Sequence, residues 1–486
     1  MEDVRKDFQE LKLLNLRDCK SVSDIVHGMD SCSFGARMLG EITNSLNELI
    51  KNNRPLAIIF DGKPEGKLFT LLTAWVQKGW ASKIYTPEDY AQNAPAGGTV
   101  LVIGKFSERV EDAIFNKPER ALFINPEGVA KPGQVKDGFY PDVSFSDPKL
   151  VLPIINLTLE ERINGKISTV TDLIKELSQY GDTATEVALG AQTLKAMVED
   201  PDCTVFLTLS GAMTIAKMGL VVCDMIDFGM VNYIASTGAL MAHGFIESVG
   251  LHHYKYNPKH DDQLLAEQSI NRVTDTLEPE ENFSHIDEVL QEILKDADPK
   301  APFSSHIFHK MLGKYLKDNF PNERGILKSA YEKNVPVVVP AFIDSEVGND
   351  VFTNNLARRR EGKEPLVMNM ELDSQVLIDT AIGSKRMGIF TIGGGVPRNN
   401  TQNVAPLIEI SNARVDSLNW PARMFHYGCK ITPDKMFYGH LSGCTYSEGM
   451  SWRKMDPKGM FTEVHTDATI AWPFMVKYVM EQLNYK

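Results

Sequence analysis

The strongest constraint on the fold is an apolar run that ends in three consecutive glycines. The sequence MGIFTIGGGV occupies residues 387–396, and PRNN follows it and opens a helix expected to run to about residue 410. Glycine has no Cβ, so three in succession let the backbone approach a cofactor where any side chain would clash. A flexible loop is the alternative, but these glycines stand directly between a strand and a helix. The pattern therefore predicts a buried strand that ends at a ligand-binding turn.

Two further segments have the same strand–turn–helix form. Residues 203–211 (CTVFLTLSG) and 231–238 (VNYIASTG) each run from an apolar strand into a turn of small residues, and a helix is expected over 216–225 after the first. Such turns favour phosphate at the carboxyl ends of strands, although neither is a GxGxxG motif. Residues 334–344 (NVPVVVPAFID) indicate a buried strand that ends on Asp344. That acid is either a ligand-binding residue or the N-cap of a following helix.

The first 150 residues also alternate between strands and helices. Strands are expected at 55–60, 99–103 and 121–124, helices over 22–50 and 69–80, and a connection to the next domain at 148–153. This alternation predicts an α/β fold. We expect a doubly wound, mostly parallel, Rossmann-like sheet within residues 151–486, preceded by an additional α/β region over residues 1–150.

The N-terminal region is a candidate degenerate repeat of the region that follows. SVSDIV at residues 21–26 and TVTDLI at residues 169–174 each precede a helix and then a strand at similar spacing. Two ordinary helix–strand units would give the same match, so both interpretations stay open. The N-terminal copy has no counterpart of the lysine segment described below, and we expect it to lack catalytic activity.

Composition bounds the class of protein and its partners. The 486 residues carry a net charge of −13, which argues against a nucleic-acid binder and suits polycationic ligands. No apolar run has the length of a membrane span, and the charged start MEDVRKDFQE is unlike a signal peptide. The six cysteines are scattered without a CxxC pair, which favours reduced thiols and a cytoplasmic protein.

Two polar segments near the middle of the chain have plain interpretations. His252 and His253 are adjacent, so their side chains point in different directions; a polar loop is favoured over a metal site because no third ligand is evident. Residues 262–282 are rich in charge and indicate a helical stretch. Neither segment is given a chemical role.

The segment SGCTYSEGMSWRK at residues 442–454 holds the candidate chemistry. A lysine becomes a nucleophile when desolvation or a neighbouring cation lowers the pKa of its amine. Trp452 would provide an apolar wall beside Lys454, and Glu448 would attract an amine substrate. Taken alone, the segment is more typical of a solvated surface.

This segment, followed by EVHTDATIAWP at residues 463–473, resembles the active-site region of the deoxyhypusine synthase family in its bacterial-type form. The resemblance extends over about residues 167–485. It implies oxidation of spermidine with NAD and capture of the aminobutyl group as an imine on Lys454. The acceptor would be a lysine of a translation factor or, in some relatives, putrescine, which gives homospermidine. It also implies a homotetramer with active sites at a subunit interface.

The resemblance assigns further residues one by one. The catalytic group would be Lys454 with Glu448, and His243 is a candidate acid or base. The amine substrate would meet Asn399, Ser442, Glu448 and Trp452. NAD would contact Ser210, Gly211, Thr237, Gly238, Asp344, Gly394, Asp467 and Ala468.

Several positions depart from the family pattern. Ala242 and His243 stand where two glutamates are usual, and Asn349 and Leu441 each replace an aspartate. The imine and NAD residues are therefore kept while the amine-recognition residues are rewritten. Arg453 replaces the usual glycine before the lysine, and its cation would either lower the pKa of Lys454 or point to solvent.

These observations favour an NAD-dependent transferase that moves an aminobutyl or similar aminoalkyl group from a polyamine to an amine acceptor, with a homospermidine-type product. Deoxyhypusine synthesis on a translation-factor lysine is the nearest alternative. A non-catalytic paralogue that regulates an active synthase and an NAD-linked amine oxidoreductase are the rivals from other classes. No metal, nucleic-acid or membrane partner is expected.

Overall fold

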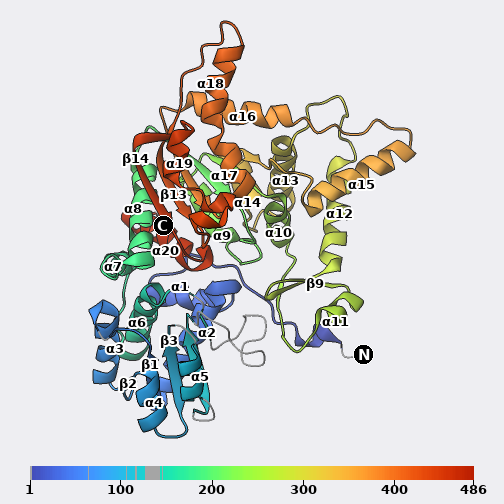
Figure 1. Ribbon diagram of the computed structural model, residues 1–486. Coiled ribbons are helices and arrows are strands. Elements are labelled where there is room, and N and C mark those ends of the chain that lie inside the picture. The colour runs from blue at the N-terminus through green and yellow to red at the C-terminus, as the bar shows by residue number, and fades with distance from the viewer. Residues whose placement is uncertain are drawn as a thin grey trace. The chain divides into compact units, whose positions relative to one another are not determined.

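The computed structural model describes residues 3–63, 65–104, 107–114, 118–125, 143–144 and 146–485. The chain divides into two compact units that are discontinuous in sequence (Figure 1). The first unit contains residues 190–468 and the N-terminal segment up to Leu16, and the second contains residues 17–189 and 469–484. This division does not follow the boundary expected at residue 150, because the C-terminal helix belongs with the second unit.

The second unit is built on a five-stranded parallel sheet in the order β2-β1-β3-β4-β5. The strands are β1 (Leu56–Phe60), β2 (Ile84–Tyr85), β3 (Thr99–Ile103), β4 (Arg120–Ile124) and β5 (Val143–Ser144). The three predicted strands are confirmed to within one residue, because each is a short apolar run bounded by turn residues.

Helices of this unit begin where the sequence offers capping side chains. Residues 22–50, expected as one helix, form two, and residues 148–153, expected as a connection, instead open a helix that Asp147 caps. The helices are α1 (Val22–Met29), α2 (Phe34–Lys51), α3 (Gly66–Gln77), α4 (Pro87–Asn93), α5 (Glu108–Ile114), α6 (Pro148–Asn164) and α7 (Val170–Leu177). The division between the units falls within the next helix, α8 (Asp182–Glu199), and within α20 (Ala468–Gln482).

The two segments compared as a repeat have matching local structure. Ser21 with Asp24, and Thr169 with Asp172, form a capping box at the start of α1 and of α7, and both helices have 8 residues. An 18-residue helix follows each of them, α2 in one case and α8 in the other, and then a strand. This succession is what a duplication requires.

The first unit contains a six-stranded sheet in the order β11-β7-β6-β12-β13-β14, with every neighbouring pair parallel. Starting from β6, the chain adds β7 and then β11 on one side of that strand. It then adds β12, β13 and β14 in turn on the other side of β6. The strands are β6 (Cys203–Leu209), β7 (Tyr233–Ser236), β11 (Val337–Val338), β12 (Arg386–Ile392), β13 (Phe425–Ile431) and β14 (Met455–Val464). Phe206, Tyr233 and Phe425 are fully buried in the core of this sheet.

Residues 262–282 are not the predicted helical stretch. Only α11 (Asp262–Glu267) is helical, and β9 (Ile270–Val273) and β10 (Thr276–Pro279) join β8 (Tyr254–Lys255) in a small antiparallel sheet. Ser269 and Thr274 adopt left-handed backbone conformations with φ of +56° and +59°, which no helix interior allows. The N-terminal arm lies against this sheet, with Val4 in its apolar cluster.

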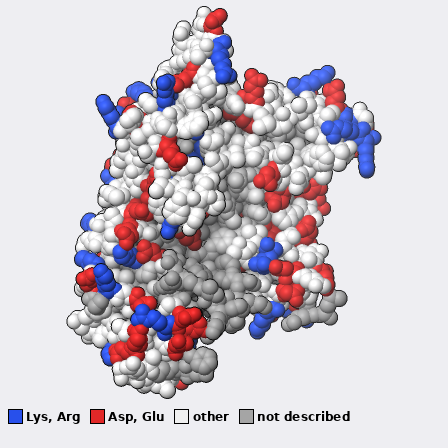
Figure 2. Space-filling model, in the orientation of Figure 1, with Lys and Arg blue, Asp and Glu red and all other residues white. Residues whose placement is uncertain are grey.

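The remaining helices of the first unit connect the strands. They are α9 (Gly219–Asp227), α10 (Gly238–Ser248), α12 (Glu280–Leu294), α13 (Ser305–Asn319), α14 (Ile326–Lys333), α15 (Glu346–Arg360), α16 (Met370–Gly383), α17 (Gly395–Gln402), α18 (Val404–Arg414) and α19 (Tyr446–Ser451). Three arginines gather in the last turn of α15, whereas acidic and basic side chains are interspersed over the rest of the face in Figure 2. Within the described residues, no helix has the length and apolar character needed to cross a membrane.

Candidate active site

Lys454 lies directly before β14 and after α19, in a pocket of about 410 Å³. Its side-chain amine, half-buried, donates a hydrogen bond of 3.1 Å to Oδ1 of Asn399 on α17. The same nitrogen is 5.7 Å from the ring centroid of Trp452. The pocket is lined by Gly395, Arg398, Asn399, Gln402, Asn403, Leu441, Cys444, Thr445, Glu448, Gly449, Trp452 and Lys454. The structure thus brings together Lys454, Asn399, Glu448 and Trp452.

The surroundings of Lys454 lower the pKa of its amine. Burial is the main cause, and the positive charge of Arg398 adds to it. Arg398 is itself buried; its guanidinium donates to the carbonyl oxygen of Leu441 at 3.2 Å and lies 5.3 Å from the ring of Tyr446. Sequence reasoning missed this residue, because nothing in PRNN tells a buried guanidinium from an exposed one.

Arg453, the cation considered in the sequence, faces away from the amine. Its side chain is 74% exposed and pairs with Glu409 at 3.1 Å. Its φ of +56° lies in the left-handed region that favours glycine. Arginine in this conformation costs backbone strain that glycine would not.

Glu448 and Trp452 both line the pocket, and Glu448 also has a structural role. The carboxylate of Glu448 accepts from the backbone N–H of Thr445 at 2.7 Å, and Thr445 in turn accepts from the backbone of Glu448. This capping box fixes the start of α19. Trp452 is 67% exposed in the single chain, so it forms one wall of the pocket without covering it.

A second buried lysine supports the floor beside the pocket. Lys430 on β13 is fully buried, donates to the carbonyl oxygen of Cys444 at 2.9 Å and pairs with Glu463 at 3.2 Å. Burial, together with the charge of Arg398, lowers the pKa of Lys430. Glu463 also accepts from the backbone N–H of Tyr446 at 2.8 Å. Lys430 therefore holds the segment that leads into α19, a role that only the folded chain reveals.

The triple glycine is explained by close backbone packing. Gly393 has φ of +75°, and a Cβ there would lie 2.3 Å from Oγ of Ser210. A Cβ on Gly394 would lie 2.4 Å from Cα of Ser442. The backbone N–H of Gly394 donates to Oγ of Ser210 at 2.9 Å, and Ser442 donates to Asp434. The carboxyl ends of β6 and β12, the two strands where the order of the sheet reverses, therefore meet Ser442 at one place.

The other residues assigned to the cofactor follow neighbouring strands. Thr237 and Gly238 lie between β7 and α10, and Gly238 packs against Ser345, whose Cβ would be 2.4 Å from an added Cβ. Gly211, with φ of +77°, begins a turn rather than a helix, since α9 starts only at Gly219. Asp467 directly precedes α20, and Ala468 is its first residue.

Asp344 is neither at the end of a strand nor an N-cap. Strand β11 stops at Val338, and the residues between it and α15 form a turn in which Asp344 is exposed. Ser345 caps α15 instead, accepting from the backbone N–H of Gly348 at 3.1 Å. The predicted strand end and the N-cap interpretation are therefore wrong, while the assignment of Asp344 to ligand binding stays a prediction.

His243 lies in a different cavity from Lys454. It belongs to α10, is nearly buried, and lines a cavity of about 440 Å³ with Asn271, Val273, Glu278, Glu280, Phe283, Glu346, Asn349 and Asp350. The described residues that line the two cavities have no member in common. His253 is fully buried, which corrects its interpretation as part of a polar loop.

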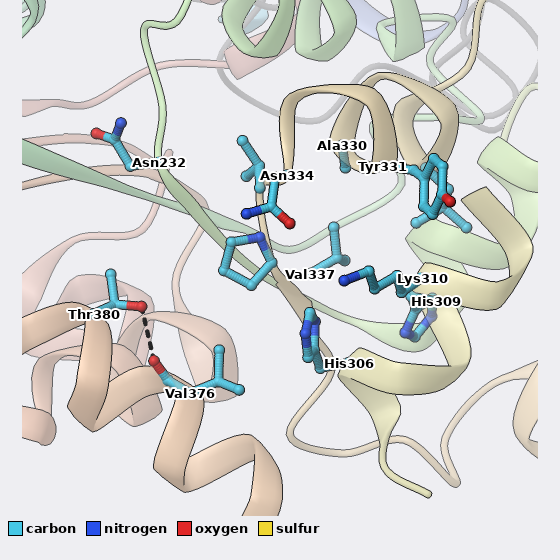
Figure 3. A pocket seen from close by; sticks show the side chains of 13 residues that line it. Asn232, His306, His309, Lys310, Ala330, Tyr331, Asn334, Val337, Val376 and Thr380 are labelled. Carbon is cyan, nitrogen blue, oxygen red and sulfur yellow. Dashed lines mark hydrogen bonds between the residues drawn. The ribbon is translucent and has the colours of Figure 1, made fainter. Parts of the chain in front are cut away.

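A third cavity, of about 340 Å³, lies at the opposite edge of the sheet. It is bordered by Asn232 and Pro336, which precede β7 and β11, and His306, Lys310 and Asn334 point toward its centre (Figure 3). Among the described residues that line it, none is a predicted site residue. The predicted site residues therefore lie elsewhere in the described chain.

Comparison with known proteins agrees with this geometry. The family model "Deoxyhypusine synthase" matches residues 172–479. "Probable deoxyhypusine synthase 2" of Methanosarcina acetivorans is 32% identical over 322 residues, which covers 66% of this chain and 90% of the relative. "Deoxyhypusine synthase-like protein" of Chlorobaculum parvum is 31% identical over 319 residues, covering 65% and 88%. "Probable deoxyhypusine synthase 1" of Archaeoglobus fulgidus is 31% identical over 315 residues, covering 64% and 94%. The chain therefore belongs to the deoxyhypusine synthase family.

Proposed function

We propose that this protein is an NAD-dependent aminoalkyl transferase that moves an aminobutyl group from a polyamine such as spermidine to a small amine, with a homospermidine-type product. The observation that carries the proposal is the half-buried amine of Lys454, held by Asn399 in a pocket that lowers its pKa. A lysine whose pKa is lowered is more readily unprotonated, and so more nucleophilic, than an ordinary exposed lysine.

The residues at the carboxyl ends of the strands fit a dinucleotide. Counted in chain order, the six strands lie 3-2-1-4-5-6, the order of doubly wound dinucleotide-binding sheets, and ligands bind where that order reverses. In the described chain, α10 and α17 follow the N-caps Thr237 and Gly394, and neither N-cap gives a side-chain hydrogen bond, so the N–H groups of the first helical turns can donate to phosphate oxygens. NAD would be held by Ser210, Gly211, Thr237, Gly238, Asp344, Gly394, Asp467 and Ala468.

The chain's own residues would perform the transfer steps. The bound nicotinamide supplies oxidation of the donor amine and the final reduction, so no net redox change occurs. The amine of Lys454 adds to the oxidised carbon, and the bond from that carbon to the departing amine breaks. The acceptor amine then adds to the Lys454 imine and releases the lysine. Asn399 orients the lysine amine, and Glu448 attracts the cationic amines.

The separation of His243 from the Lys454 pocket within one chain is consistent with the homotetramer expected for the family. In such an assembly, a cavity lined by His243 in one subunit would face the Lys454 pocket of another. Light scattering of the purified protein, which gives its mass in solution, tests this arrangement directly. A monomer would separate the two cavities and contradict it.

Deoxyhypusine synthesis is the nearest alternative, and the printed names of the relatives favour it. The rewritten amine-recognition positions, with Asn349 and Leu441 uncharged, favour a different acceptor. A regulatory paralogue would not need the pocket around Lys454. An oxidoreductase would need no lysine nucleophile.

One turnover experiment separates these activities. Purified protein is incubated with NAD and spermidine, with putrescine or a translation-factor acceptor added in parallel, and products are identified by mass spectrometry. Homospermidine without accumulation of NADH supports the proposal. Label on the protein acceptor supports deoxyhypusine synthesis, accumulating NADH supports an oxidoreductase, and inertness supports a regulator. Lys454→Ala should abolish the product, whereas Lys458→Ala, a change at an exposed lysine in β14, should not.

A further inference from the structure

A buried network of titratable side chains leads to the cavity at His243. It consists of Lys217, Glu247, His253, Glu278 and His243, all of them buried. The N-terminal arm closes over it, since the backbone N–H groups of Leu11 and Leu14 donate to the carbonyl oxygens of His253 and Lys217. Burying titratable groups costs free energy unless each of them has a hydrogen-bond partner. The positions of the hydrogens in this network can therefore be derived from the neighbours of each group.

The position of the proton on His253 follows from its neighbours. Nζ of Lys217 lies 2.9 Å from Nδ1 of His253, and an ammonium group has only donors, so Nδ1 accepts. The hydrogen of a neutral ring is then on Nε2, which lies 2.9 Å from Oε2 of Glu278. A protonated ring would direct Nδ1–H to Glu247, at 3.3 Å, and would still carry a hydrogen on Nε2. Nε2 of His253 donates to Glu278 in both cases.

Glu278 is an ionised acceptor with every oxygen engaged. Burial acts to raise its pKa, but the contacts with His243 and His253 outweigh burial and lower the pKa to about 2. Oε1 accepts from the side-chain amide of Asn282 at 3.0 Å. Oε2 also lies 2.7 Å from Nδ1 of His243, a close ion-pair contact whose angle is outside that of a hydrogen bond. A carboxylate at this distance would repel a lone pair on Nδ1, so the hydrogen of the neutral His243 ring is favoured on Nδ1.

The other ring nitrogen of His243 is therefore the basic one. In the neutral ring, Nε2 keeps its lone pair, and it lies on the side of Glu346, whose Oε1 is 3.9 Å away. A carboxylate–histidine pair of this kind fixes the tautomer and the direction of the ring, as in enzymes that use histidine as a general base.

The cavity in front of His243 suits a cationic ligand. Glu280, Glu346 and Asp350 line it together with His243 and Glu278. Burial and the neighbouring carboxylates of Asp287 and Glu346 raise the pKa of Asp350 to about 7. A positive charge in the cavity would relieve this repulsion.

A metal ion is the alternative occupant, because one atom each of His243, His253 and Glu278 lie within 4.8 Å of one another. A metal would need the lone pair of Nε2 of His253. That nitrogen carries a hydrogen as long as Lys217 donates to Nδ1, and a metal would also stand near the lysine cation. The hydrogen-bond pattern therefore favours a base over a metal ligand.

We propose that Glu278 positions His243 as the proton acceptor for an ammonium group bound in this cavity, with His253 and Lys217 fixing Glu278 in place. The proton moves from the ligand nitrogen to Nε2 of His243. The products are a neutral amine with a lone pair for attack and an imidazolium that faces Glu278. This inference rests on the proposed function, since the amine freed in this way is the acceptor that releases Lys454 from its imine.

The groups that face His243 determine its response to pH. They are Glu278 from β10, Glu346 and Asp350 from α15, Glu280 from the start of α12 and His253 from the segment before β8, with Lys217 and Glu247 behind it. Carboxylates outnumber cations in this set, so the imidazolium formed by proton transfer is stabilised.

Nitrogen-15 NMR of histidine rings in the full-length protein tests the proposal without turnover. The protein is labelled at histidine, and His243→Gln assigns the signals of that ring. We expect the neutral ring of wild-type His243 to carry its hydrogen on Nδ1, with Nε2 unprotonated. Glu278→Gln should shift the tautomer toward Nε2–H. Glu280→Gln makes the same chemical change at another wall of the cavity and should leave the tautomer unaltered.

Two outcomes would overturn the inference. One is a wild-type His243 ring with its hydrogen on Nε2, which needs no variant and is decisive even if Glu278→Gln fails to fold. The other is a stoichiometric metal ion in the purified protein, found by elemental analysis. An Nδ1–H tautomer in a protein that makes no polyamine product would leave the positioning role intact and refute the proposed function instead.

Discussion

Gly394→Ala should displace the segment that carries Ser442 and lower the stability of the first unit. The φ of Gly394 is 171°, outside the left-handed region, so the contacts of the added Cβ dominate the effect. The new Cβ would lie 2.4 Å from Cα and 2.7 Å from Cβ of Ser442. Because the nearest atom belongs to the backbone, no side-chain rotation relieves the contact.

The segment cannot move freely to make room. It is tied at both ends, by Arg398 to the carbonyl of Leu441 at 3.2 Å and by Lys430 to the carbonyl of Cys444 at 2.9 Å. Overpacking of this kind costs about 1–3 kcal/mol. A value of about 2 kcal/mol changes the folding equilibrium constant by roughly 30-fold.

Urea denaturation followed by circular dichroism measures this effect. Gly383→Ala is the matched control, since no described atom lies within 4 Å of its added Cβ and its backbone is not left-handed. Ser442→Gly added to Gly394→Ala should fail to restore stability, because the contact with Cα persists. Equal midpoints for Gly394→Ala and Gly383→Ala would refute the packing argument.

Three further changes have defined outcomes. Arg453→Gly should raise the free energy of unfolding by about 0.5 kcal/mol, because it removes left-handed strain and loses only a surface ion pair. Arg453→Ala should not raise the free energy of unfolding, and thermal denaturation distinguishes the two variants. Lys430→Met should lower the free energy of unfolding by about 3–5 kcal/mol in urea titrations, because a carboxylate loses its buried partner. Arg398→Gln removes a cation that lowers the pKa of Lys454, so reaction of that amine with an aldehyde probe should require higher pH; an unchanged pH profile would contradict this.

Sequence patterns were most informative where a local rule decides the structure. The strands at 203–209 and 387–392 are apolar runs bounded by turn residues, and both form as predicted. The glycines after the second strand were predicted to form a ligand-binding turn, and the structure adds that Gly393 packs against Ser210 and Gly394 against Ser442. Capping boxes at Ser21 and Thr169 likewise follow from four adjacent residues.

The missed features depend on contacts between distant parts of the chain. The many charged residues of segment 262–282 led to the prediction of a helix. The segment instead contains two short strands, which are stabilised by pairing with β8 and by the N-terminal arm. The boundary between the units was missed because α20 lies near the end of the sequence and joins residues 17–189. Local periodicity carries no information on either pairing.

The candidate site likewise has some features that local sequence predicts and others that depend on distant parts of the chain. Lys454 and Trp452 stand in one short motif, so their proximity could be predicted. The roles of Arg398, Lys430 and Glu278 depend on burial and on partners far away in sequence, and a charged residue gives no sign in sequence that it will be buried. His243 was singled out from the family pattern, but its partner Glu278 was expected in a helix.

Reduction with borohydride during turnover tests the central claim most directly. The protein is incubated with NAD and spermidine, treated with borohydride, digested and analysed by mass spectrometry. The account predicts an added aminobutyl group on the peptide that contains Lys454 and none on the peptide that contains Lys430. An unmodified Lys454 in a protein that still forms product, or a modification found on another lysine, would contradict it.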